Sequence, residues 1–355
     1  MTKKTTVALV FGGRSAEHEV SLKSAGAVFD NLDKGRFRVI SIFINKQGQW
    51  KRVPSPHLSP RELGRKPFAG FLPWDATSLS GSVRADVYFP VLHGPYGEDG
   101  TIQGLFEMAG VAYVGAGVLG SAVGMDKAVM KTLFLSKGIP TPRCRVFLEP
   151  EWKRGPGKIL ARIRREFGVP FFVKPANMGS SIGVSKVKEI SGAGAALELA
   201  FRYDRKVLVE EGILGRELEC SVLGNDAPEA SLPGEVVPFR EFYDYDDKYV
   251  DGKTGFVIPA RLSAPVIKKV RALAVEAFQA CDCAGMARVD LFLGGDGKNL
   301  TVNEINTIPG FTEISMYPKL WEVSGLPFPR LLERLIELGL ERHRTKKSCV
   351  VRDIG

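Results

Sequence analysis

Apolar runs alternate with amphipathic segments through the first third of the chain, the pattern of strands that alternate with helices. The predicted elements are, in order, a strand at Val7–Phe11, a helix with Leu22, Ala25, Val28 and Phe29 on one face, and strands at Val39–Ile44 and Asp86–Leu92. We expect Ser21 to cap the helix. The alternation predicts a parallel sheet with helices on both faces. Ligands bind such sheets beyond the carboxyl ends of the strands, where Gly12-Gly13 and His93-Gly94 lie.

Two further segments of the first third are assigned no chemistry. Residues 48–84 are rich in Pro, Gly, Lys and Arg and show little periodicity, which predicts an irregular surface excursion. Glu98 and Asp99 precede a predicted helix at Thr101–Met108, and their charges favour its positive N-terminus. We interpret both acids as capping residues rather than catalytic ones.

The rest of the chain predicts two further units. The middle unit is a small α+β module with a helix at Lys127–Lys137 and strands at Phe171–Lys174, Val184–Val187 and Val207–Glu211. The last unit opens with a strictly alternating strand at Glu217–Leu223 and includes helices at Pro265–Cys281 and Phe328–Leu340. The chain therefore divides into residues 1–125, 126–215 and 216–355.

Composition and charge narrow the class of protein. The 355 residues, 44% hydrophobic and 25% charged, are enough for two or three domains with cores. Apolar runs stay below the roughly 18 residues of a membrane span and the chain starts without a signal peptide, so we expect a cytoplasmic protein. The net charge of +9 comes from dispersed Lys and Arg, which favours nucleotides over nucleic acid as partners. The five cysteines indicate free thiols rather than disulfides.

The most informative chemistry lies in two short segments, Gly285–Leu291 and Val302–Gly310. Paired as adjacent strands in an even register, they place four polar side chains on one face: Arg288, Asp290, Glu304 and Asn306. Two carboxylates and an amide oxygen are hard ligands that suit Mg²⁺ held together with substrate phosphates, and the arginine suits an anion. A solvated hairpin edge is the alternative that the local pattern leaves open.

A second candidate is the loop Pro175–Gly183, which follows Lys174 and lies between two predicted strands. Its glycines and hydroxyls suit a flexible phosphate cover, although it is not a P-loop because no helix begins there. Lys127 and Lys174 could each neutralise phosphate. Glu210 and Glu211 end a strand whose backbone could bind an adenine edge while a carboxylate takes the ribose hydroxyls. An ordinary turn and a charged strand end remain the alternatives.

A third candidate is Glu17, which follows Gly12-Gly13 and would point into the same crevice as His93. A carboxylate there suits a substrate ammonium, and an acid that complements the helix dipole is the alternative. The glycine pair lacks the third glycine of the dinucleotide fingerprint, so nicotinamide chemistry is not expected.

Taken together, these motifs resemble the D-alanine–D-alanine ligases of the ATP-grasp superfamily, from Val7 to about Leu340. The matching segments, in the family's order, are Phe11–Leu22, Leu92–Gly104, Met125–Lys127, Lys174–Ser185, Phe242–Tyr249, and Arg288–Asp290 with Asn303–Gly310. The resemblance implies an N-terminal Rossmann-like parallel-sheet domain at 1–125 and a two-part ATP-grasp fold. The small ATP-grasp domain would be 126–215, and the C-terminal domain, 216–355, would hold the metal site and the lid loop.

The resemblance also implies a reaction. One D-alanine carboxylate attacks the γ-phosphate of ATP, and the amine of a second D-alanine then displaces phosphate from the acyl phosphate, which supplies dipeptide for peptidoglycan. The implied cofactors are two Mg²⁺ ions, which Mn²⁺ can replace, and a monovalent cation such as K⁺ can assist. The family also implies a homodimer, with no nucleic acid or membrane as partner.

The family's functional residues map onto this sequence. The implied metal ligands are Asp290, Glu304 and Asn306. The implied nucleotide contacts are Lys127, Lys174, Ser180, Ser181, Glu210, Glu211, Ile213, Glu217 and Lys248. The implied substrate contacts are Glu17, His93, Arg288, Gly310, Ser315 and Met316, of which Arg288 and the Gly310 N–H would stabilise the oxyanion.

The resemblance further implies a lid, residues 242–258. Ser180 and Tyr249 would join Glu17 in a hydrogen-bonded triad that closes the lid and excludes water, which would hydrolyse an acyl phosphate. The Lys248-Tyr249 pair predicts an amine as second substrate. A D-alanyl-D-lactate ligase, another ATP-grasp carboxylate–amine ligase or a non-catalytic nucleotide-binding regulator are the alternatives.

Overall fold

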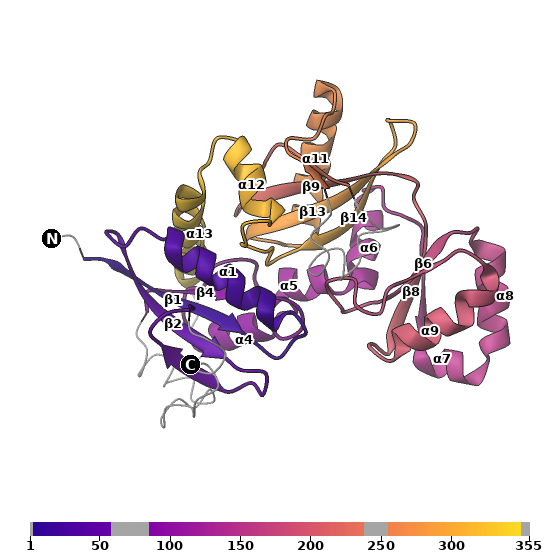
Figure 1. Ribbon diagram of the computed structural model, residues 1–355, viewed down its shortest axis with the longest axis horizontal. Helices are drawn as coiled ribbons and strands as arrows, with labels where there is room; N and C mark the ends of the chain where they lie inside the picture. Colours follow the sequence, from indigo (N-terminus) through magenta and orange to yellow (C-terminus); the bar gives the residue numbers. More distant parts are fainter. Residues whose placement is uncertain (1–2, 58–84, 238–254, 349–355) are drawn as a thin grey trace.

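The computed structural model describes residues 3–57, 85–237 and 255–348, and these residues form a mixed α/β structure built on three sheets (Figure 1). The first sheet has the order β3-β2-β1-β4. Its strands are β1 (Thr5–Gly12), β2 (Phe37–Ile44), β3 (Trp50–Val53) and β4 (Val87–Val91). β1 pairs in parallel with β2 and with β4, which confirms the predicted parallel arrangement.

The strand β3 is a correction to the sequence analysis, which assigned residues 48–84 to irregular structure. It pairs antiparallel with β2 and buries Trp50 and Val53. A strand of four residues is too short to show a clear period in the sequence. Residues 58–84 of that predicted excursion lie outside the described residues.

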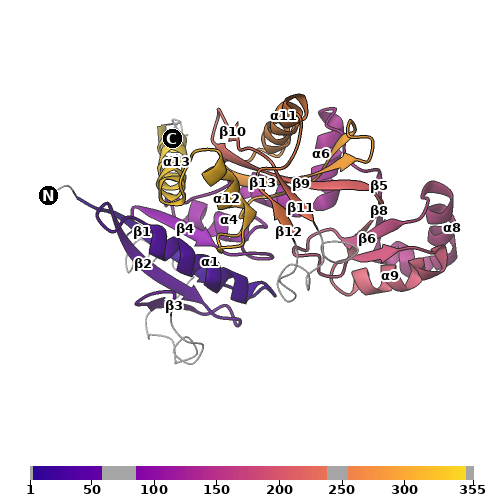
Figure 2. The same cartoon turned by 45° about the horizontal axis from the view of Figure 1, so that its top comes forward.

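Helices cover both faces of the first sheet, as predicted. The odd-numbered residues of β1 from Val7 to Phe11 pack with α1 (His18–Asn31) and α13 (Phe328–Ser348). The even-numbered Ala8 and Val10 pack with α4 (Thr101–Met108) on the other side. The helix α13, which follows the other described elements in sequence, therefore completes the core of the first sheet (Figures 1 and 2).

Ser21 does not cap α1, contrary to expectation, because the helix begins at His18. The Ser21 hydroxyl is buried; it accepts a hydrogen bond of 2.7 Å from the Gly12 N–H and donates one to the Val91 carbonyl. It thus ties the carboxyl ends of β1 and β4 to the helix. The periodic apolar positions of α1 begin only at Leu22, so the sequence pattern did not reveal the polar first turn of the helix.

The second sheet is antiparallel, in the order β5-β8-β6-β7. Its strands are β5 (Cys144–Leu148), β6 (Phe171–Pro175), β7 (Ser185–Val187) and β8 (Lys206–Glu211), and its helices are α7 (Glu149–Arg154), α8 (Pro156–Glu166), η1 (Ile190–Gly192) and α9 (Ala193–Phe201). The predicted strands β6, β7 and β8 are confirmed. The preceding helix α6 (Lys127–Ser136) packs Met130 and Phe134 into the core of the third sheet.

The third sheet has the order β12-β11-β9-β13-β14, with β10 on β9. Its strands are β9 (Gly215–Gly224), β10 (Glu229–Ala230), β11 (Gly234–Val237), β12 (Gly255–Val257), β13 (Gly285–Gly294) and β14 (Leu300–Asn306). The associated helices are α5 (Val118–Met125), α11 (Ala264–Ala280) and α12 (Met316–Val323). β13 and β14 are antiparallel, with Arg288 opposite Asn306 and Asp290 opposite Glu304, which confirms the even register.

A β-bulge interrupts this pairing. Asp290 lies opposite Glu304, but Leu291 lies opposite Val302, so Asn303 is an extra residue in β14. The bulge reverses the alternation of the strand. Val302, before it, is buried in the core, whereas Glu304, after it, lines a cavity on the other face.

Two expectations from composition can also be compared with the structure. Among the described residues, Cys144, Cys220, Cys281 and Cys283 are all free thiols, as predicted. None of the helices in the described ranges has the length and apolarity needed to cross a membrane.

We predict that Ser21→Ala lowers the free energy of unfolding by about 1–3 kcal/mol, because two buried backbone groups lose their partner. Urea unfolding would measure this change. Ser136→Ala, which removes an exposed hydroxyl that bonds within α6, is the control and should change stability by less than about 0.5 kcal/mol. Equal stability of the two variants would contradict the role of Ser21.

Candidate functional site

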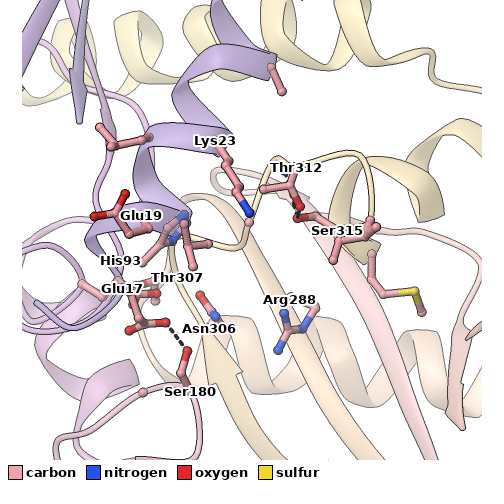
Figure 3. A pocket seen from close by; sticks show the side chains of 18 of the residues that line it. Glu17, Glu19, Lys23, His93, Ser180, Arg288, Asn306, Thr307, Thr312 and Ser315 are labelled. Carbon is pink, nitrogen blue, oxygen red and sulfur yellow. Dashed lines mark hydrogen bonds between the residues drawn. The ribbon is translucent and has the colours of Figure 1, made fainter. Parts of the chain in front are cut away.

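A cavity of about 890 Å³ lies between the carboxyl ends of β1 and β4 and the polar face of β13 and β14 (Figure 3). Ten of the residues expected at the site line it: Glu17, His93, Lys127, Ser180, Arg288, Glu304, Asn306, Gly310, Ser315 and Met316. In Figure 3, Glu17 and Ser180 lie at one side of the cavity, connected by a hydrogen bond, and Ser315 lies at the other side. Arg288 and Asn306 lie between these two sides.

The other expected residues fall into two groups. Described but not part of the cavity wall are Lys174, Ser181, Glu210, Glu211, Ile213, Glu217 and Asp290. The lid residues Lys248 and Tyr249 lie outside the described residues.

Glu17 is held at one side of the cavity, just before α1. It is only 6% exposed, and one oxygen accepts a hydrogen bond from the Ser180 hydroxyl. Its other oxygen lies so close to Gly94 that a Cβ there would meet it at 2.6 Å. Gly94 also has a φ of +75°, so glycine is required there on two grounds. The loop at Gly94 and the loop at Ser180 thus fix the carboxylate between them.

His93 is buried beside Glu17. Its Nδ1 lies 3.0 Å from the Ile308 carbonyl, which can only accept, so Nδ1 carries the proton. Its Nε2 then accepts from the Ser24 hydroxyl at 3.2 Å. Burial lowers the pKa of His93, although the charge of Glu17 opposes this. We infer a neutral imidazole that links β4, α1 and the segment after β14.

Glu98 does not cap a helix, which corrects the sequence analysis. It is 7% exposed and accepts a hydrogen bond from the Gly94 N–H on the cavity wall. Burial, followed by the nearby charge of Glu17, raises the pKa of Glu98 to about 8. Asp99 does have the expected local role, because its oxygens accept from the N–H groups of Tyr96 and Thr101.

Arg288 and Asp290 form a bidentate ion pair on the polar face of β13. The Nε–Oδ1 and Nη2–Oδ2 distances are 2.7 and 2.6 Å. Arg288 also lies 3.2 Å from Glu219, which is opposite Asp290 on the neighbouring strand β9. The guanidinium is therefore held by two carboxylates beside the cavity, in a planar geometry that also suits an oxyanion.

The donor set on this face fits a hard cation that shares phosphate ligands. Asp290 and Glu304 are directly opposite each other, and Asn306 follows on the same face. Within the described residues, no group of three or more His, Cys, Asp or Glu could hold a metal ion by itself. Two carboxylates and an amide leave coordination positions for phosphate oxygens and water, as Mg²⁺ prefers.

Two lysines approach the polar face of β13 and β14 from different elements. Lys127, at the start of α6, lies 3.3 Å from Glu304 and donates to the Met178 carbonyl at 2.8 Å. Lys174, on β6, lies 2.5 Å from Glu210 and 3.5 Å from the Asn303 side chain. Both ammonium groups thus lie close to polar groups of β14, Lys127 beside Glu304 and Lys174 beside the Asn303 side chain.

The Glu210 carboxylate is 1% exposed and is bound by lysines, so its side chain is not presented to a ribose. The Glu211 carboxylate accepts from the Arg143 N–H at 2.7 Å and is likewise engaged. These contacts compete with the predicted role of a carboxylate at the ribose hydroxyls and leave the predicted backbone contact with adenine untested.

The far side of the cavity is the N-terminus of α12. Ser315 precedes the helix, and its hydroxyl accepts from the Thr312 N–H at 2.9 Å. A Cβ on Gly310 would meet the Ser315 oxygen at 2.6 Å, so a larger residue there would displace the Ser315 hydroxyl from its present position. Lys23, on α1, projects toward Thr312 (Figure 3). Backbone N–H groups at a helix N-terminus together with a lysine suit a carboxylate.

Sequence reasoning missed Lys23, Glu98 and Glu219 on the cavity wall and Ser24, which bonds His93. Glu219 could have been predicted, because it lies two residues from Glu217 and therefore on the same polar face of a predicted strand. No sequence pattern marked Glu98 as a cavity residue, since an acid before a helix normally has a capping role.

Two family models match the chain. One, described as the D-ala D-ala ligase N-terminus, matches residues 6–116, and the other, the D-ala D-ala ligase C-terminus, matches residues 133–337. A D-alanine–D-alanine ligase of Halothermothrix orenii is 51% identical over 95% of this chain and 99% of its own length. That of Heliobacterium modesticaldum is 48% identical over 97% of each.

Solved structures agree with the sequence comparisons. The D-alanine–D-alanine ligase of Coxiella burnetii superposes with a TM-score of 0.82 at 36% identity, over 98% of this chain and 97% of that one. The VanG D-Ala:D-Ser ligase of Enterococcus faecalis gives 0.83 at 36% identity, over 95% and 100%.

We predict that Glu98→Gln removes a pH dependence of stability. The folded-state pKa of about 8 lies above that of an unfolded glutamate, so protonated Glu98 stabilises the fold at acid pH. This contribution is lost as the pH rises through about 8. In urea titrations between about pH 5 and pH 9, the native chain should lose more stability than Glu98→Gln. Asp99→Asn should keep the native slope. Parallel curves for the native chain and Glu98→Gln would rule the assignment out.

Proposed function

The chain belongs to the D-alanine–D-alanine ligase family, and on this basis we propose that it joins two D-alanine molecules while converting ATP to ADP and phosphate. The observation that carries the proposal is the shared cavity. The oxygen-rich face of β13 and β14 opens onto the same space as Glu17 and the N-terminus of α12. Nucleotide, ammonium and carboxylate groups can thus meet at one place.

We propose a division of labour among three parts of the chain. Residues 1–125 would form a Rossmann-like substrate domain, a proposal supported by the parallel β1, β2 and β4. Residues 126–215 and 216–355 would form the two parts of an ATP-grasp fold, with nucleotide between their sheets. The position of Lys174 and Glu304, on different sheets but both near Asn303, supports this arrangement.

For the first D-alanine, we assign the ammonium to Glu17. Burial and the nearby charge of Glu17 raise the pKa of Glu98, so Glu98 resists adding a second carboxylate charge to this part of the cavity. Neutral His93 holds the wall behind it without competing for the ammonium. Arg288 and the Gly310 N–H would then stabilise negative charge on the reacting carboxyl group.

For the nucleotide, we assign Asp290, Glu304 and Asn306 as ligands of two Mg²⁺ or Mn²⁺ ions. Bound there, the ions would neutralise phosphate charge and orient the γ-phosphate. Lys127, Lys174, Ser180 and Ser181 would contact phosphates, and Glu211, Ile213 and Glu217 would border the base and ribose. Asp290 gives one hydrogen-bond acceptor site on each oxygen to Arg288 in this structure, and the remaining lone pairs of the carboxylate would be available to a cation.

For the second D-alanine, we assign the carboxylate to Ser315, Met316 and the N-terminus of α12. Its amine would attack the acyl phosphate, and phosphate would leave. Closure by Lys248 and Tyr249, with Ser180 bonded to Glu17, would exclude water from the intermediate. The relatives named above favour an amino acid over D-lactate as the second substrate.

The wider setting is proposed on the same basis. The dipeptide would enter peptidoglycan precursor synthesis in the cytoplasm, the active form would be a homodimer, and K⁺ could assist turnover.

The reaction can be tested directly. With ATP, Mg²⁺ and D-alanine, we expect phosphate release and D-alanyl-D-alanine in equal amounts. Adding D-lactate should give little mixed product. Phosphate release without dipeptide, or no release with D-alanine, would contradict the proposed function.

We predict that Glu304→Ala lowers Mg²⁺-dependent dipeptide synthesis by roughly 10²–10³-fold, the scale of one lost charge contact at a reacting centre. The melting temperature should change little, because Glu304 lines the cavity rather than the core. The control is Glu276→Ala on the exposed side of α11, which should retain native activity. Near-normal turnover in Glu304→Ala would show that this residue is not a metal ligand.

A further inference from the structure

Lys131, on α6, is almost completely buried, with 1% of its surface exposed. Its ammonium lies 2.6 Å from the Glu210 carboxylate, 2.9 Å from the Asn303 carbonyl and 3.2 Å from the Thr141 hydroxyl. Burying an ammonium is unfavourable unless its donors are paired. Lys131 therefore joins three separate segments, β8, β14 and the chain after α6, at one buried point.

One of these partners is the bulge that orients Glu304. Asn303 is the extra residue of β14, and Lys131 Nζ donates to its carbonyl oxygen. The segment after α6 also binds the neighbouring Val302. The Val302 N–H donates to the Pro140 carbonyl at 2.7 Å, and the Val302 carbonyl accepts from the Thr141 hydroxyl at 2.8 Å. The bulge is thus fixed by α6 and the segment that follows it.

The other partner, Glu210, is shared between two lysines. One of its oxygens bonds Lys131 and the other bonds Lys174 at 2.5 Å. Burial lowers the pKa of Lys174, but Glu210 and Glu304 raise it more, so its net pKa lies above the ordinary value. Glu210 thus fixes the Lys174 ammonium while its other oxygen is bound by Lys131, so the position of Lys174 depends on both partners of this carboxylate.

We propose that Lys131 is a positioning residue of the nucleotide site, which holds the Asn303 bulge behind Glu304 and shares the carboxylate that fixes Lys174. It does not line the cavity and would touch no substrate. The proposal rests on the function proposed above, because it assigns nucleotide and metal to Lys174 and Glu304. A lysine that only stabilised the fold would leave nucleotide affinity unchanged.

The test is calorimetric titration of Mg·ADP into the full-length chain. Lys131→Met should weaken Mg·ADP binding by roughly 10–100-fold, the usual effect of losing a group that orients metal or phosphate ligands. It should also raise the Mg²⁺ concentration needed for half-maximal turnover. Lys137→Met removes an exposed lysine at the end of the same helix and should bind Mg·ADP like the native chain.

Thr141→Val provides a second variant that keeps the buried charge and the side-chain shape. It removes one partner of Lys131 and should weaken Mg·ADP binding by about 3–10-fold, the equivalent of one hydrogen bond. If Lys131→Met does not fold, Thr141→Val carries the test. Native Mg·ADP affinity in the folded variants, with only a lower melting temperature, would overturn the proposal.

The two proposals fail in different ways. A native chain that binds Mg·ADP but makes no dipeptide would contradict the proposed function. The role of Lys131 would then still be decided by the Mg·ADP affinity of its variants. A native chain that makes dipeptide, together with a Lys131→Met variant of native affinity, would contradict only the role of Lys131.

Discussion

The antiparallel pairing of β13 with β14, shifted by the bulge at Asn303, is the constraint on which the site depends. A regular strand would place Val302 and Glu304 on the same face, so that either a carboxylate entered the core or an apolar side chain entered the cavity. The bulge removes this conflict. It lets Val302 pack in the core while Glu304 and Asn306 face the cavity opposite Asp290 and Arg288. An ionised carboxylate in the core would be strongly unfavourable, so the bulge is required by the sequence itself.

Ion pairs, most of them between elements that are distant in sequence, compensate the charges around the cavity. Arg288 is held by Asp290 and Glu219, Glu304 by Lys127, and Glu210 by two lysines. These pairs compensate the charges of an oxygen-rich cavity within the protein itself. Glu98 follows a different rule, because its protonated form avoids a second charge beside Glu17. The cavity is thus prepared for cations and anions at separate positions.

Sequence periodicity predicted β1, β2, β4, β6 to β9, β13 and β14, the helices α1, α4, α6, α11 and α13, and the shared polar face, since each depends on local alternation. It did not predict β5, β10, β11, β12, α5, α7, α8 or α12. It missed β3, which is short, and misplaced the start of α1, whose first turn is polar. It could not predict that Lys131 bonds to Asn303 or that Arg288 bonds to Glu219, because these pairs form between separate elements. The bulge did leave a signal. Apolar residues fall at Leu300, Val302 and Ile305, and the change of spacing from two to three marks the extra residue. The contact of Glu17 with Ser180 was expected from the family resemblance rather than from periodicity, and the structure contains it.

The central claim is that the face of β13 and β14 holds the metal that binds ATP. The most direct measurement is anomalous diffraction from crystals of the full-length chain grown with Mn²⁺ and a non-hydrolysable ATP analogue. We predict anomalous peaks bonded to oxygen atoms of Asp290, Glu304 and Asn306 and to the phosphates of the analogue. Manganese bound to the phosphates but away from all three side chains would contradict the account.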